Sequence, residues 1–153
     1  MKVALGSDHA GFVLRQTVVE WLAQKGVQIL DYGVQVSERE QAPRSVDYPD
    51  FAAPVVNSVL SKQSDWGVLI CGSGLGMSYA ANRYEGIRAA LCREEHSARM
   101  ARQHNDANIL VLGERFTGRD LALAIVNTWM ESEFEGGRHA RRIALLDQMP
   151  DWR

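Results

Sequence analysis

The stretch from Gly67 to Arg83, GVLICGSGLGMSYAANR, contains the residues best suited to chemistry. An apolar run ends at Cys71, three glycines follow within five residues, and a helix-like pattern then begins. Glycines let the backbone turn tightly and point successive N–H groups into one concavity. The start of the following helix adds partial positive charge there. The candidate anion-binding loop therefore comprises Gly72, Ser73, Gly74, Leu75 and Gly76.

The loop also admits two other interpretations. A tight turn between a strand and a helix requires glycines even when it binds nothing. A dinucleotide fingerprint, G-x-G-x-x-G, would need glycine at position 77, where this chain has Met77. Such fingerprints usually belong to chains with a further substrate domain, for which 153 residues leave no room. Dinucleotide binding is the weakest of the three interpretations.

Cys71 directly precedes the loop, so the same N–H groups and helix terminus would stabilise a thiolate. It is therefore a candidate base or nucleophile. The alternative is a small buried residue that only ends a strand, which is the usual role of a free cysteine. Cys92 ends a later apolar run with no glycine loop after it, and we interpret it as a core residue.

Three further polar residues stand at predicted element ends. Asp8 and His9, in GSDHAG, follow the first apolar run and could move protons or bind sugar hydroxyls. Asp8 could instead only cap the next helix. His104 ends a predicted helix, where a protonated imidazole is favoured and would suit a general acid. A plain surface histidine is the alternative for that position.

The C-terminal segment is basic. Arg138 and Arg142 are four residues apart, so a helix would place both on one face, where paired guanidinium groups suit a phosphate. A solvated basic face is the alternative. No His/Cys pattern has metal-ligand spacing, and His96 with His104 lacks convergent carboxylates, so we expect no metal site.

The elements that must position these residues alternate along the chain. Short apolar runs predict strands at 2–6, 27–33, 66–71, 87–92 and 107–113. Helical spacing predicts helices at 12–24, 50–60 with Asp50 as its cap, 77–84, 94–104, 117–134 with Thr117 as its cap, and 138–148. This alternation predicts an α/β fold, a three-layer αβα Rossmann-like single domain over residues 1–153 with a five-stranded parallel sheet. Ligands bind such sheets at the carboxyl ends of the strands.

Composition narrows the class of protein. A net charge of −2 gives no overall attraction to nucleic acid or to an anionic membrane, and we expect neither as a partner. No apolar window approaches the length of a transmembrane helix, and the N-terminus does not resemble a signal peptide. We therefore expect a cytoplasmic protein with free thiols. The polar stretch from Gly33 to Pro49 is predicted to be a long loop.

Seven motifs in order resemble one family, the type B ribose-5-phosphate isomerases with the related galactose-6-phosphate and allose-6-phosphate isomerases. The motifs are GSDHAGF, DYP, LICGSGLGMSYAANR, GIRAAL, RQHNDANIL, GER and EGGRHARR. Together they span nearly the whole chain. The resemblance implies a Rossmann-like aldose–ketose isomerase of the pentose phosphate pathway that uses no metal or organic cofactor. It also implies a homodimer, or a tetramer made of two such dimers, with each site between two subunits.

The resemblance implies roles at matching positions. Cys71 matches the catalytic base, Gly72 to Gly76 match the loop that holds the enediolate oxygens, and Ser73 stands where many members have threonine. His104 matches the histidine that opens the sugar ring, and Asp8 assists with hydroxyl protons. The matching substrate-binding residues are His9, Arg138 and Arg142 for the phosphate, with Tyr48, Asn105 and Arg115. The partner chain is expected to supply His104, Asn105 and Arg115.

Two departures bear on these expectations. One branch of the family has a glutamate base directly after the last loop glycine, where this chain has Met77, so either Cys71 serves as the base or the chain is inactive. The loop from Gly33 to Pro49 is longer than in typical members and could change the preferred sugar. Ribose 5-phosphate is the first expectation; a six-carbon sugar phosphate, a non-catalytic sugar-phosphate-binding module and a small nucleotide-binding oxidoreductase subunit are the alternatives.

Overall fold

The computed structural model describes residues 1–36 and 42–149. The described residues form a parallel five-stranded sheet in the order β2-β1-β3-β5-β4. Its strands are β1 (Lys2–Ser7), β2 (Gln28–Asp31), β3 (Trp66–Cys71), β4 (Ala89–Leu91) and β5 (Ile109–Gly113). The α/β class and the three-layer arrangement predicted from the alternating pattern are confirmed.

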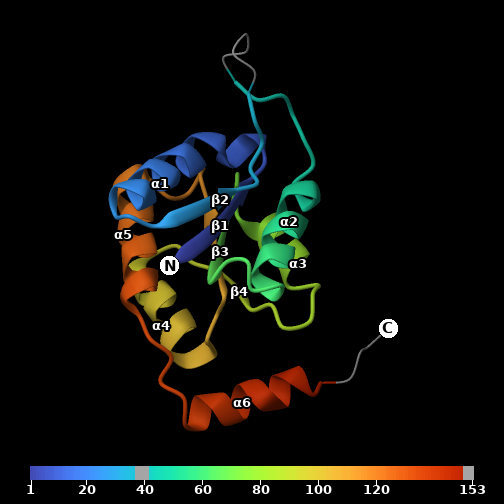
Figure 1. Ribbon diagram of the computed structural model, residues 1–153, viewed down its shortest axis with the longest axis vertical. Coiled ribbons are helices and arrows are strands. Elements are labelled where there is room, and N and C mark those ends of the chain that lie inside the picture. The colour runs from blue at the N-terminus through green and yellow to red at the C-terminus, as the bar shows by residue number, and fades with distance from the viewer. Residues whose placement is uncertain (37–41, 150–153) are drawn as a thin grey trace.

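Helices cover both faces of the sheet (Figure 1). One face packs against α1 (Phe12–Gln24), α4 (Glu95–Asn105) and α5 (Arg119–Glu131), and the other against α2 (Pro49–Leu60) and α3 (Leu75–Ala81). Successive residues of one strand alternate between the two cores: Ile70 belongs to the first and Cys71 to the second. Both faces are thus apolar, which is why the strands read as continuous hydrophobic runs. The thiol of Cys71 is directed towards α2 and α3.

The order of the strands creates a switch point between β1 and β3. The chain crosses from β1 to β2 on one side and then returns to β3 on the other side of β1. In open α/β sheets such a point leaves a crevice at the carboxyl ends of the two strands. Asp8 follows β1, and Cys71 ends β3. The topology therefore brings these two predicted residues to the same edge.

Several predicted helix starts need correction. Helix α3 begins at Leu75 rather than Met77, because Gly74 adopts a left-handed φ of 78° that turns the chain directly into the helix. Thr117 does not cap α5: its hydroxyl is buried without a hydrogen-bond partner, and Gly118 occupies the cap position. Asp50 lies in the first turn of α2, which begins at Pro49. The predicted loop from Gly33 to Pro49 includes residues 37–41, which lie outside the described residues.

A buried arginine fixes the start of that loop. Arg15 is 2% exposed, and its guanidinium donates to the Ser7 hydroxyl at 2.9 Å and to the Val34 carbonyl at 2.7 Å, besides pairing with Asp31. A Cβ on Gly33 would lie 2.2 Å from the Arg15 side chain, so only glycine fits there. The chain therefore leaves β2 in a fixed direction, alongside the end of β1.

Candidate active site

The carboxyl edge of the sheet carries the loop between β3 and α3. The Gly74 N–H donates to the Cys71 sulfur at 3.2 Å, and Cys71 is 5% exposed. The start of α3 directs its free N–H groups towards the same edge. The sulfur therefore accepts a backbone N–H from the glycine loop, as its position before the glycines predicted.

Asp8 and His9 lie at this edge too. The Asp8 carboxylate accepts the N–H groups of Ala10 at 2.9 Å and Gly11 at 3.1 Å, both on Oδ1. It therefore caps the short 3₁₀ helix His9–Gly11, and this capping uses one carboxylate oxygen. The Val46 N–H donates to His9 Nδ1 at 3.2 Å, which ties the returning loop to the site.

Tyr48 and Arg115 complete the carboxyl-edge group. A Cβ on Gly76 would lie 2.8 Å from the Tyr48 ring, so the ring rests on the glycine backbone. A Cβ on Gly72 would lie 3.1 Å from the Arg115 guanidinium. The Arg115 N–H also donates to the Gly72 carbonyl at 3.0 Å. Arg115 thus reaches the glycine loop of its own chain, which corrects the expectation that only a partner would bring it there.

Met77 lies in the first turn of α3, directly after the loop. Its side chain is fully buried within the core beneath α2 and α3. The position where some family members have glutamate is therefore part of the packing in this chain. Cys92 is buried as well, and desolvation raises its pKa to about 11. Its interpretation as a core residue fits a thiol kept protonated.

The remaining predicted residues gather elsewhere. His104 and Asn105 end α4, just before β5 begins, so they lie at the amino edge of the parallel sheet. Helix α6 (Arg138–Asp147) packs against α4 and extends below it in Figure 1. A cavity of about 430 Å³ lies between the two helices. Its lining comprises His104, Asn105, His139, Arg142, Ile143 and Leu146.

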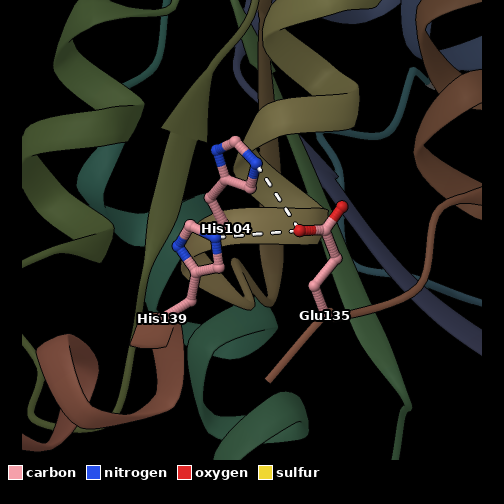
Figure 2. A group of neighbouring side chains, drawn as sticks. All are labelled: His104, Glu135 and His139. Carbon is pink, nitrogen blue, oxygen red and sulfur yellow. Dashed lines mark ion pairs between the residues drawn. The ribbon is translucent and has the colours of Figure 1, made fainter. Parts of the chain in front are cut away.

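Two residues at the amino edge were missed from the sequence. The His139 ring stacks on the His104 ring, with centroids 4.2 Å apart and planes within 5°. The Glu135 carboxylate lies 3.8 Å from His104 Nε2 and 3.7 Å from His139 Nε2 (Figure 2). Desolvation, with the positive charges of His104 and Arg138, lowers the pKa of His139. The four-residue spacing of Glu135 and His139 could have indicated from the sequence that these two side chains lie close together.

The described residues thus divide the predicted site into two groups. The carboxyl-edge group holds Asp8, His9, Tyr48, Cys71, the loop Gly72–Gly76 and Arg115. The amino-edge group holds His104, Asn105, Arg138 and Arg142. Because the two edges are separated by the length of the strands, one chain does not bring both groups together. A larger cavity, of about 780 Å³, also lies at the amino edge, between α6 and residues 82–90.

Comparison with known proteins places this arrangement in a family. The sequence model of the family described as Ribose/Galactose Isomerase matches residues 3–146. The chain belongs to this family. It is 45% identical over 145 residues to ribose-5-phosphate isomerase B of Escherichia coli, covering 95% of this chain and 93% of that protein. It is 36% identical over 143 residues to D-erythrulose-4-phosphate isomerase of Pectobacterium atrosepticum, covering 94% and 91%.

Solved structures of proteins from this family have the same fold as the chain. Ribose-5-phosphate isomerase B from Clostridium thermocellum superposes with a TM-score of 0.91 at 49% identity, covering 97% of this chain and 96% of that one. The protein of the same name from Thermotoga maritima gives a TM-score of 0.90 at 51% identity, covering 97% and 98%. The fold and the isomerase class are therefore those of the Ribose/Galactose Isomerase family. No helix among the described residues is both long and apolar enough to cross a bilayer.

Proposed function

We propose that residues 1–153 act as one domain that interconverts an aldose phosphate and its ketose, with ribose 5-phosphate and ribulose 5-phosphate as the preferred pair. The observation that carries the proposal is the Gly74 N–H directed at the Cys71 sulfur, 3.2 Å away. The reaction removes a carbon-bound proton and leaves negative charge on oxygen. A thiolate among amide donors suits both requirements.

The base is Cys71, which must act as the thiolate to remove a proton. Its sulfur takes the proton from the carbon beside the aldehyde and returns it to the former aldehyde carbon. Between these transfers the enediolate oxygens accept hydrogen bonds from the backbone of Gly72–Gly76. Losing one such donor typically costs ~3–4 kcal/mol of transition-state stabilisation. The Ser73 hydroxyl, which accepts the Leu75 N–H at 3.3 Å, helps to fix this loop.

Sugar phosphates are mostly cyclic, so the ring must open before the proton transfer. His104 is suited to this step, because an imidazole can both donate and accept a proton. Asp8 retains a carboxylate oxygen that can accept a sugar hydroxyl. Arg138 and Arg142 are exposed and four residues apart on α6, where two guanidinium forks can bind one phosphate. His9, Arg115, Asn105 and Tyr48 are the further substrate contacts.

The separation of the two groups supports a homodimer. The base lies at one edge of the sheet and the ring-opening histidine at the other, so a second copy must supply the missing half. Residues with apolar side chains exposed on the last turns, Leu145, Leu146 and Met149, give α6 a face for such contact. We therefore propose that each site contains Cys71 of one chain and His104 of another.

The proposal predicts that Cys71→Ala abolishes turnover of ribose 5-phosphate while phosphate-ligand binding persists, since the arginines are untouched. Ketose formation is followed for ribose 5-phosphate, allose 6-phosphate and galactose 6-phosphate, and loss of the ketose is followed for erythrulose 4-phosphate. The last tests the activity named for the P. atrosepticum relative. Unchanged turnover in Cys71→Ala would remove the proposed base. Saturable binding with no isomerisation of any sugar would favour a binding module instead.

A further inference from the structure

Three side chains at the amino edge could meet at one point. His104 comes from the end of α4, Glu135 from the segment between α5 and α6, and His139 from the first turn of α6. One nitrogen or oxygen atom of each lies within 4.8 Å of the others. Figure 2 shows the Glu135 carboxylate directed at both imidazoles.

His139 supplies a second, independent observation. Its side chain is 8% exposed, and its Nε2 is buried with no hydrogen-bond partner among the described residues. A buried polar atom without a partner costs stability, so such atoms usually have a partner or bind something. The Glu135 carboxylate lies 3.7 Å from this nitrogen, too far for a hydrogen bond. A ligand held between the two would satisfy both groups.

We propose that His104, Glu135 and His139 bind a divalent transition cation of the Zn²⁺ class, with water in the fourth position. Two imidazole nitrogens and one carboxylate oxygen form a ligand set that Zn²⁺ prefers, whereas Mg²⁺ and Ca²⁺ prefer oxygen alone. The proposed role is inhibition. This role rests on the proposed function, because a cation on His104 would occupy the imidazole nitrogen through which ring opening must exchange a proton.

The geometry requires small shifts of the Glu135 carboxylate and a rotation of one imidazole ring. Zn–N and Zn–O bonds of about 2.0–2.2 Å place tetrahedral ligand atoms roughly 3.3–3.5 Å apart, against 3.8 Å and 3.7 Å from Glu135 to the two imidazoles. One ring must also tilt, because the rings are within 5° of parallel. The side chains of His104 and Glu135 are 35% and 49% exposed and can adjust, while the buried His139 stays fixed.

The surrounding charge limits the affinity. Arg138 and Arg142 place positive charge beside His139, and one carboxylate offsets only part of it. We therefore expect weaker binding than at a structural zinc site. Because the arginines are also the proposed phosphate binders, cation and sugar phosphate should compete.

The test measures binding of the metal alone to the full chain, after dialysis against a chelator. Titration calorimetry with Zn²⁺ should give one ion per chain, and Co²⁺ should give the intense visible absorption of a four-coordinate ion. Glu135→Gln and His139→Gln should each weaken binding about tenfold or more, by loss of a ligand. His96→Gln is the matched control, because His96 is an exposed histidine on the same helix as His104, and its binding should match that of the native chain.

Activity assays then test the role. Zn²⁺ should inhibit the native chain, and its inhibition constant should rise about tenfold or more in Glu135→Gln. Glu135 is exposed, so this variant does not threaten the fold. No binding, or binding and inhibition unchanged in both variants, would overturn the site and direct attention to the Cys71 thiol. Zinc binding by a chain that isomerises no sugar would refute the proposed function and leave the site standing.

Discussion

The two thiols illustrate how local surroundings separate residues of one type. Both are buried, Cys71 at the end of β3 and Cys92 directly after β4, but on opposite faces of the sheet. Cys71 faces a backbone N–H, whereas Cys92 lies 3.6 Å from the Ala90 carbonyl oxygen and near the Glu94 carboxylate. Desolvation by burial, together with the Glu94 carboxylate, raises the pKa of Cys92, whereas Cys71 has a backbone donor within reach of its sulfur. Chemistry is therefore assigned to Cys71 alone.

Burial of Cys92 predicts a pH dependence of stability. Because its pKa is raised from 9.0 to about 11 in the folded chain, the unfolded chain loses the proton at lower pH. The stabilisation is therefore present below about pH 9 and lost as pH rises towards 11. Urea unfolding at pH 8 and pH 10.5 should show a smaller decrease in the free energy of unfolding for Cys92→Ala than for the native chain. Equal decreases would contradict the prediction.

Contacts between residues close together in the sequence could be predicted, whereas contacts between distant residues could not. Cys71 and its glycine loop are adjacent, so local turn chemistry was enough to predict their contact. Glu135 and His139 meet His104 only because α6 packs back on α4. Spacing rules applied to one segment cannot find such a group, and the prediction of no metal-ligand pattern considered His96 instead. The glycine loop was predictable, whereas the histidine stack was not.

At the scale of elements, the glycine loop is held by a close approach from β5. A Cβ on Gly113 would lie 2.5 Å from the Ser73 carbonyl oxygen and 2.6 Å from its carbon. Backbone cannot move aside as a flexible side chain can. Gly113, the last residue of β5, therefore fixes the position of the loop at the edge of the sheet. A residue predicted only to end a strand thus also shapes the site.

The alternating pattern predicted the order and type of the elements, because each buried strand and each amphipathic helix carries its own periodicity. The first and last residues of the elements were harder to predict. The start of α3 depends on the left-handed φ of Gly74, and the start of α5 depends on the buried Thr117 hydroxyl, which faces the core instead of capping. Both are outcomes of tertiary packing that local sequence does not encode.

Gly113→Ala should therefore damage both stability and activity. The added methyl group must displace the Ser73 backbone, which we expect to cost about 1–3 kcal/mol in the free energy of unfolding and to lower kcat about 10–100-fold by shifting the amide donors. Gly118→Ala is the matched control, since nothing lies within 4 Å of a Cβ there. Thermal unfolding and kcat for ribose 5-phosphate provide the readouts. A Gly113→Ala variant with native kcat would show that the loop does not depend on this approach.

At the scale of the whole molecule, the decisive fact is that strands have direction. In a parallel sheet every residue that follows a strand lies at one edge, and every residue that ends a crossover helix lies at the other. Cys71 and Asp8 belong to the first class and His104 to the second. No side-chain adjustment spans that length. A composite site between copies of the chain is the arrangement that uses both groups.

Complementation tests this composite site. Cys71→Ala and His104→Asn should each be inactive alone, yet in a mixed dimer one site combines the native Cys71 of one chain with the native His104 of the other. Random exchange of equal amounts makes half the dimers mixed with one working site of two, so activity should return to about one quarter of the native value. The measurement is ketose formation before and after subunit exchange by mild denaturation and refolding. Refolding each variant separately is the control, and a mixture no more active than these would mean that each chain carries its whole site alone.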